Sequence, residues 1–183
     1  FIAMELMKDT LRNKLATEKK LSPKEAISII RDIAMALNYA HKDYNIVHRD
    51  IKPENILISR EGIYKLSDWG LASMQILMGQ TTGYKGTLVY SAPEQFDPNV
   101  GKIGPWTDVW QLGAVFYELV AGEAPFGSDP AQVVNKVLKS DLAPITDVPK
   151  ELNELIQKML QKNPTERITM EDVIKELQAL EVE

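Results

Sequence analysis

Four polar side chains in the first half of the sequence are spaced for chemistry. Asp50, Lys52 and Asn55 fall within one short polar stretch, and Asp68 follows after two brief apolar runs. Two carboxylates, an amide and an amine suit phosphoryl transfer, because a divalent metal must offset the phosphate charge and Mg²⁺ prefers hard oxygen ligands. A carboxylate near the attacking hydroxyl and a cation near the phosphate complete such a site. The sequence therefore predicts metal-assisted phosphoryl transfer.

A β-hairpin is expected to bring these residues together. The apolar runs 56–58 and 63–66 are separated by a short segment that contains a glycine, which is a hairpin signal. Asp50 and Asn55 precede the first run, and Asp68 follows the second. The hairpin therefore returns Asp68 to the loop that carries Asp50 and Asn55.

The rest of the chain is predicted to be a helical bundle. Ser22 before Pro23, with Glu25 three residues after Ser22, is typical of a capped helix start with a capping box. Residues 107–121 are apolar nearly all round, which indicates a helix buried at the centre. Further expectations are helix caps at Thr10, Asp129 and Thr169, an amphipathic stripe at 152–160, a short strand over 1–7 and a long loop over 74–90.

The composition is that of one globular domain. The 183 residues are 44% hydrophobic and 26% charged, and the net charge is −5. This charge argues against a nucleic-acid partner held by electrostatics. The apolar stretch 109–121 is too short to span a membrane, and no signal peptide is visible. The absence of cysteine fits a reducing compartment, and we expect a cytoplasmic location.

The ordered set of motifs resembles the C-terminal lobe of a eukaryotic-type protein kinase, over essentially the whole chain. The matching residues are His48-Arg49-Asp50 with Asn55, Asp68-Trp69-Gly70 with Trp69 in place of the usual phenylalanine, Ala92-Pro93-Glu94, Asp108-Val109-Trp110 with Gly113, and Arg167. The resemblance implies a mainly α fold with a small β-hairpin that carries the catalytic and metal-binding loops. It implies that 1–183 is one lobe, with 1–8 as the last N-lobe strand and hinge and 68–94 as the activation segment.

The resemblance also implies ATP and Mg²⁺ as cofactors and a protein substrate with a serine or threonine hydroxyl. Asp50 would orient or deprotonate that hydroxyl, and Lys52 would neutralise charge on the transferring phosphate. Asn55 and Asp68 would bind Mg²⁺ and so the nucleotide, while His48 would hold the loop geometry. The adenine ring would lie against Met4, the hinge residues Glu5 and Met7, and the floor residue Leu57.

Regulation and substrate binding are expected in the activation segment. Lys52 together with Thr87 ahead of Tyr90 resembles the serine/threonine-specific branch, and Thr87 would contact the substrate. Our hypothesis is that Thr82, or next Thr81, is phosphorylated and that Arg49 pairs with the phosphate.

Three further residues have structural roles by the same resemblance. Glu94 and Arg167 are expected to form a buried ion pair, whose loss would leave one charge unpaired. Asp108 belongs to the predicted central helix.

Part of the family pattern lies outside these residues. The glycine-rich loop, the strand lysine and its glutamate partner all belong to the N-terminal lobe, so we expect this chain alone to be inactive or nearly so and to need that missing lobe as a partner. Apolar surface around Phe1, Met4, Leu57 and Trp69 is expected to favour self-association.

Two other functions remain open from the sequence. The first is a pseudokinase or docking module, against which the intact Asp50, Asn55 and Asp68 argue. The second is a small-molecule phosphotransferase, which Trp69 weakly favours and the Ala92-Pro93-Glu94 element opposes.

Overall fold

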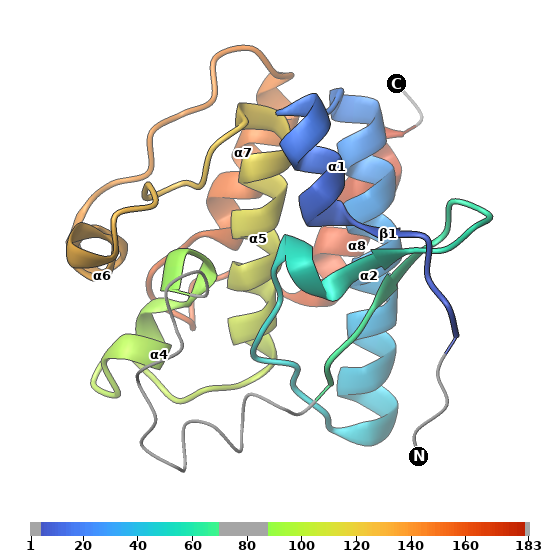
Figure 1. Ribbon diagram of the computed structural model, residues 1–183. Coiled ribbons are helices and arrows are strands. Elements are labelled where there is room, and N and C mark those ends of the chain that lie inside the picture. The colour runs from blue at the N-terminus through green and yellow to red at the C-terminus, as the bar shows by residue number, and fades with distance from the viewer. Residues whose placement is uncertain (1–4, 70–87, 182–183) are drawn as a thin grey trace.

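The computed structural model describes residues 5–69 and 88–181 of the chain. It is mainly helical with one small antiparallel sheet, as the sequence predicts, and α5 runs through the middle of the bundle between its neighbours (Figure 1). The elements are β1 (Asp9–Thr10), α1 (Leu11–Glu18), α2 (Pro23–Tyr44), β2 (Ile56–Ile58), β3 (Tyr64–Leu66), α4 (Pro93–Phe96), α5 (Pro105–Ala121), α6 (Pro130–Lys139), α7 (Lys150–Met159) and α8 (Met170–Leu180). Short 3₁₀ helices at Pro53–Asn55 and Leu88–Tyr90, and the single turn α4, were not predicted.

The first strand begins later than predicted. Residues 5–7 form no strand, and the ladder starts where the backbone N–H of Lys8 donates to Ile58 at 2.8 Å. The predicted cap at Thr10 is confirmed, because its side chain accepts from the backbone N–H of Asn13 at 3.1 Å and α1 follows directly.

Helix α2 begins at the predicted cap, but its capping box differs from the prediction. Ser22 accepts from the backbone N–H of Glu25 at 3.3 Å, and Pro23 occupies the first helical position. The carboxylate of Glu25 pairs with Lys14 of α1 at 3.0 Å. The side chain of Glu25 therefore joins two helices.

The predicted hairpin is confirmed as β2 and β3. Ile56 pairs with Leu66 and Ile58 with Tyr64, and β1 adds a third antiparallel strand on the other edge of β2. Ile56 is fully buried, so this end of the sheet is anchored in the core. The loop before β2 and the residues after β3 therefore lie at the same end of the hairpin.

Helix α5 is the central element, as predicted, but it starts at Pro105 rather than at 107. Its residues from Thr107 to Val120 are all buried, because α2 packs on one side and α7 on another. Gly113 lies so close to α7 that an added Cβ would come within 2.8 Å of the side chain of Met159. Gly113 therefore permits the close approach of the two helices.

The C-terminal helices cover the remaining faces of the core. The predicted caps at Asp129 and Thr169 are confirmed, since their side chains accept from the backbone N–H groups of Ala131 and Asp172. The stripe of α7 is buried through residues such as Leu152. Helix α8 packs along α2, which closes the bundle (Figure 1).

Candidate active site

Asp50 lies in the loop between α2 and the 3₁₀ helix Pro53–Asn55. Its Oδ2 accepts a hydrogen bond from Nδ2 of Asn55 at 3.0 Å and lies 3.0 Å from Nζ of Lys52. The side chains of Asp50 and Lys52 remain 21% and 19% exposed. Three of the four side chains that the sequence predicts for phosphoryl transfer therefore meet at one partly exposed carboxylate.

The amide of Asn55 has a fixed orientation. Its Nδ2 donates to both the Oδ2 and the backbone carbonyl of Asp50, the second at 2.8 Å. Because both amide hydrogens are directed at Asp50, the acceptor atom Oδ1 points the other way. Amide and carboxylate oxygens are ligands that Mg²⁺ prefers. Asn55 therefore presents the oxygen that a metal site needs.

The hairpin returns Asp68 to the same place. The backbone N–H and the hydroxyl of Ser67 both donate to the carbonyl of Asn55, at 2.9 and 3.1 Å. The next residue, Asp68, has a φ of +60°, in the left-handed region that non-glycine residues rarely adopt. Such conformations concentrate at functional sites. Asp68 is thus held beside Asn55 by main-chain geometry.

These two oxygen donors fit Mg²⁺ as proteins usually bind it. Within 5–69 and 88–181, no cluster of three or more histidine, cysteine, aspartate or glutamate side chains is arranged to hold a metal. Mg²⁺ commonly takes one or two protein oxygens and fills its other positions with water and phosphate. Asn55 and Asp68 supply that number of ligands.

His48 ties the catalytic loop to the hairpin. It is fully buried, and its Nε2 donates to the carbonyl of Ser67 at 2.8 Å while Nδ1 faces the backbone N–H of Asp50 at 3.3 Å. These bonds select the neutral tautomer with the proton on Nε2. The ring of Trp69 packs edge-on against it, with 4.9 Å between centroids. Both ring nitrogens of His48 therefore serve the loop geometry.

Asp108, near the start of α5, accepts hydrogen bonds from the backbone of the loop that carries Asp50. Its fully buried carboxylate accepts from the backbone N–H groups of His48 and Arg49, both at 2.8 Å, and contacts Nε2 of His41 at 2.7 Å. Arg49 has a φ of +69°. The two N–H bonds to one carboxylate offset the strain of that conformation.

The side chain of Arg49 has a donor without an acceptor among residues 5–69 and 88–181. Its Nε is buried, and no group in that part of the chain accepts a hydrogen bond from it. A buried donor without an acceptor costs free energy, so an anion that reached this guanidinium would be bound favourably.

Glu94 and Arg167 form a buried bidentate pair. Nη1 and Nη2 of Arg167 lie 2.8 and 3.1 Å from the two carboxylate oxygens, and both side chains have no exposed surface. Thr107 donates to the same carboxylate at 2.8 Å. The segment that begins α4 is thus attached to the C-terminal part of the bundle.

A second polar cluster beside the loop was not predicted from the sequence. Arg12 of α1 bonds Glu54 at 2.9 Å and Glu118 at 2.8 Å, and it also donates to the hydroxyl of Tyr90. Tyr90 in turn donates to Glu118 at 2.5 Å. Burial, and then the neighbouring carboxylate of Glu118, raises the pKa of Tyr90. The sequence signal was Glu118 inside a mostly apolar helix, because such a buried charge requires a partner.

The residues expected around adenine are only partly described. Glu5 is exposed and pairs with Lys65 at 2.7 Å, and Met7 is half-buried near the start of the chain. Leu57 is half-buried in the middle strand of the sheet. The predictions on Met4, Gly70, Thr81, Thr82 and Thr87 lie outside the described residues.

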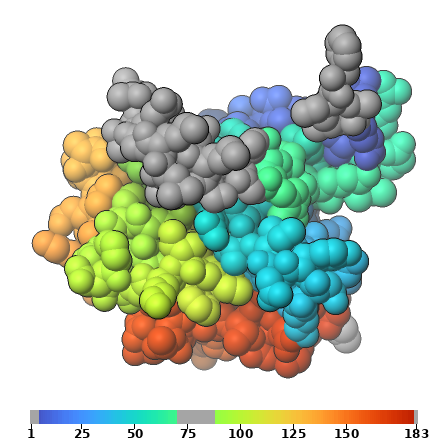
Figure 2. All heavy atoms as spheres, turned by 90° about the horizontal axis from the view of Figure 1, so that it is seen from below, coloured from blue at the N-terminus to red at the C-terminus, as the bar shows by residue number. Residues whose placement is uncertain are grey.

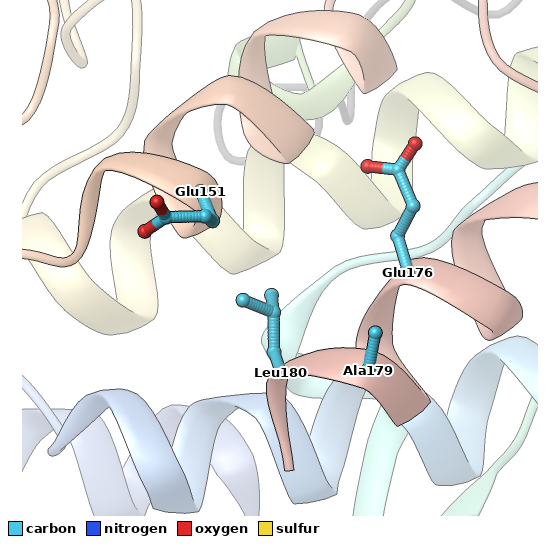
Figure 3. Close-up of a pocket in the computed structure, with 4 residues that line it drawn as sticks. All are labelled: Glu151, Glu176, Ala179 and Leu180. Carbon is cyan, nitrogen blue, oxygen red and sulfur yellow. The ribbon is translucent and has the colours of Figure 1, made fainter. Parts of the chain in front are cut away.

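One small pocket is remote from this site. It has a volume of about 160 Å³ and lies between the start of α7 and the end of α8, where Glu151, Glu176, Ala179 and Leu180 line it (Figure 3). Glu176 is already paired with Lys158 at 2.9 Å. The pocket contains none of the predicted catalytic residues.

Among the described helices, none is both long and apolar enough to cross a membrane.

The chain is similar in sequence to known protein kinases. The family model of the protein kinase domain matches residues 1–177. Serine/threonine-protein kinase PknB of Mycolicibacterium smegmatis is 37% identical over 177 residues, which cover 91% of this chain and 28% of that protein. PknB of Mycobacterium tuberculosis H37Rv is 36% identical over 177 residues, again 91% and 28%. Protein kinase kin1 of Schizosaccharomyces pombe is 35% identical over 156 residues, 85% of this chain and 17% of that protein. The chain therefore spans less than a third of these relatives.

Proposed function

This chain belongs to the protein kinase domain family, and on that premise we propose that it is the catalytic and substrate-binding lobe of a protein serine/threonine kinase. The observation that carries the proposal is the convergence on Asp50. Lys52 and Asn55 meet its carboxylate, and Ser67, the residue before Asp68, is bonded to the carbonyl of Asn55. The reaction would move the γ-phosphoryl group of ATP to a serine or threonine hydroxyl of a protein.

In this reaction Asp50 would receive the proton of the acceptor hydroxyl. Its Oδ2 is bound by Lys52 and Asn55, so Oδ1 is the atom best placed to accept from a substrate. Lys52 is close enough to share its charge between Asp50 and an incoming phosphate oxygen. The pair therefore combines a base and a cation in one loop.

Asn55 and Asp68 would hold Mg²⁺, which offsets the negative charge of the nucleotide phosphates when it is bound. The fixed amide of Asn55 directs Oδ1 away from Asp50. The metal would therefore bind Oδ1 of Asn55, whereas the carboxylate of Asp50 would act as the base. Met4, Glu5, Met7 and Leu57 would contact the adenine ring.

Phosphorylation would regulate this site. The buried Nε of Arg49 has no acceptor within the described part of the chain, and a phosphate on Thr82, or next on Thr81, would supply one. Thr87 would contact the peptide near the acceptor residue. Peptide mapping of active protein tests this: phosphate at one of these threonines supports it, and phosphate at neither contradicts it.

The 183-residue polypeptide by itself is expected to transfer phosphate poorly or not at all. Its sequence includes neither a glycine-rich phosphate loop nor the lysine-bearing strand of the family, and phosphate positioning is most of this catalysis. The exposed Leu6, Ile63 and Trp69 favour association with an N-terminal lobe or with a second copy. Robust Mg²⁺-dependent transfer by this polypeptide alone would contradict the expectation.

The full-length protein that carries this chain provides the test. It is incubated with radiolabelled ATP, Mg²⁺ and a generic basic protein, and the labelled amino acid is identified. We expect phosphoserine or phosphothreonine, and we expect Asp50→Asn to lower kcat by about 100-fold or more, in line with the loss of a general base.

Other outcomes of the same assay identify the competing functions. Nucleotide binding without transfer to any protein favours a pseudokinase or docking module. Transfer to small alcohols but not to protein favours a small-molecule phosphotransferase. Phosphotyrosine as the sole product contradicts the serine/threonine assignment.

A further inference from the structure

The side chain of a buried glutamine forms hydrogen bonds with the backbone on both sides of Asp50. Gln111 of α5 is 1% exposed. Its Oε1 accepts from the backbone N–H of Ile51 at 2.9 Å, and its Nε2 donates to the backbone carbonyl of Arg49 at 2.9 Å. One planar side chain therefore fixes the residue before and the residue after the catalytic carboxylate.

A second glutamine, Gln95, links Gln111 by hydrogen bonds to the end of the activation segment. Nε2 of Gln111 donates to Oε1 of Gln95 at 2.9 Å. Gln95 in α4 also donates to the carbonyl of Arg49 at 3.2 Å, and its Oε1 accepts from the backbone N–H of Ala92 at 2.8 Å. Ala92 lies directly before Pro93 and Glu94. The chain of bonds thus runs from the Glu94 segment to the loop of Asp50.

The segments joined by these two glutamines also lie side by side at the molecular surface. Figure 2 shows the atoms of α4 and the start of α5 (yellow-green) directly against those that follow α2 (cyan). Two segments that are distant in sequence therefore share one surface (Figure 2).

The two amides have no alternative arrangement. Both hydrogens of Nε2 in Gln111 are used, and Oε1 of Gln95 accepts twice. If either amide were flipped, donors would face donors at Ile51 or Ala92 and carbonyls would face each other at Arg49. A hydrogen-bonded network of this kind favours one geometry and resists intermediate ones.

We propose that Gln95 and Gln111 are positioning residues, a two-amide relay that transmits the placement of the Ala92–Glu94 segment to the backbone around Asp50. This inference rests on the proposed function of Asp50 as the base. Anchoring of Glu94 by Arg167 fixes the start of α4, and α4 carries Gln95. The catalytic loop therefore reaches its working geometry only when the end of the activation segment is docked.

The relay makes a prediction that simple packing does not. Removing Gln95 breaks bonds to Ala92 and Arg49 and frees one hydrogen of Gln111, so the amide of Ile51 loses support although Gln95 does not touch it. Gln95 is half-buried, whereas Gln111 is in the core, and this makes Gln95→Met the primary variant. Methionine keeps the length of the side chain and removes its polar atoms.

The experiment compares full-length wild type with Gln95→Met, Gln111→Met and the double variant. Gln178→Met, exposed on α8, is the matched control. Hydrogen exchange is followed by mass spectrometry in the peptide that carries the Ile51 amide. We expect exchange there to be about three- to tenfold faster in Gln95→Met, the effect of weakening one hydrogen bond. The control should exchange as wild type does.

Steady-state kinetics supply the second measurement. We expect Gln95→Met to lower kcat about tenfold or more with peptide KM unchanged, because misplacing a reacting group by about 1 Å costs up to about 100-fold. Since the two amides act in series, the double variant should be little worse than the worse single variant. Additive losses, or unchanged exchange at Ile51 in a Gln95→Met protein, overturn the relay.

The two measurements separate this inference from the proposed function. If wild type transfers no phosphate but Gln95→Met still accelerates exchange at Ile51, the relay stands and the assignment of Asp50 fails. If wild type is active and Gln95→Met matches it in both exchange and kcat, the relay fails and the assignment stands.

Discussion

Arg167 donates to both carboxylate oxygens of Glu94, and neither side chain has any exposed surface. The remaining guanidinium hydrogens go to the backbone carbonyls of Trp106, Gln161 and Lys162. All five donors of the arginine are therefore satisfied inside the protein. The ring of Trp110 lies against the same guanidinium, 5.1 Å away. This arginine joins the start of α4, the start of α5 and the segment before α8.

Loss of that arginine should be strongly destabilising. Arg167→Met leaves the Glu94 carboxylate buried without its counter-charge, so we expect the free energy of unfolding to fall by about 3–5 kcal/mol. Urea denaturation provides the measurement. Lys175→Met, which removes the exposed ion pair with Asp172, is the matched control and should leave the midpoint unchanged. Equal effects of the two substitutions would show that the buried pair contributes no more to the free energy of unfolding than the exposed pair.

The carboxylate of Asp108 is expected to matter for both stability and turnover. Asp108→Asn turns an N–H₂ group toward at least one of the backbone donors of His48 and Arg49, which leaves a buried donor unsatisfied and costs about 1–3 kcal/mol. Arg49 then loses the bond that offsets its left-handed φ, so kcat should fall as well. Asp43→Asn, exposed at the end of α2, is the control. A variant as stable and as active as that control would contradict this role of Asp108.

Tyr90 should make the fold sensitive to alkaline pH. Burial, and then the carboxylate of Glu118, raise the pKa of Tyr90 above the ordinary value of about 10, so the folded state keeps a proton that the unfolded state loses. The contribution of Tyr90 is complete below about pH 10 and declines above it, by at most about 1.4 kcal/mol per pH unit. We therefore expect the stability difference between wild type and Tyr90→Phe to stay constant up to about pH 9 and then to shrink. A difference independent of pH throughout would refute the burial of a neutral tyrosine.

Local physical chemistry made much of this fold predictable. The caps at Thr10 and Asp129 depend on a side chain and a backbone N–H two or three residues away, so the sequence contains both partners. The hairpin depends on two apolar runs and a short turn, and it places Asp68 beside Asn55. Those features are confirmed because they need no information from distant parts of the chain.

The parts that the sequence analysis missed depend on tertiary contacts. Gln111 and Glu118 stand out in the sequence as polar residues in an apolar helix, but their partners lie on α4, α1 and the catalytic loop. A buried polar group must be paired, and the sequence alone does not identify the partner. Similarly, Glu25 had the right spacing for a capping box, but Lys14 of α1 is its partner.

The most direct test of the account is a Mg²⁺ titration of phosphotransfer by the full-length protein carrying Asp68→Asn. If Asn55 and Asp68 hold the metal, loss of one charged ligand should raise the Mg²⁺ concentration for half-maximal activity by about tenfold or more and lower the maximal rate. Asp147→Asn, exposed in the loop before α7, should titrate as wild type does. An Asp68→Asn protein with the wild-type Mg²⁺ dependence and rate would contradict the phosphotransfer site.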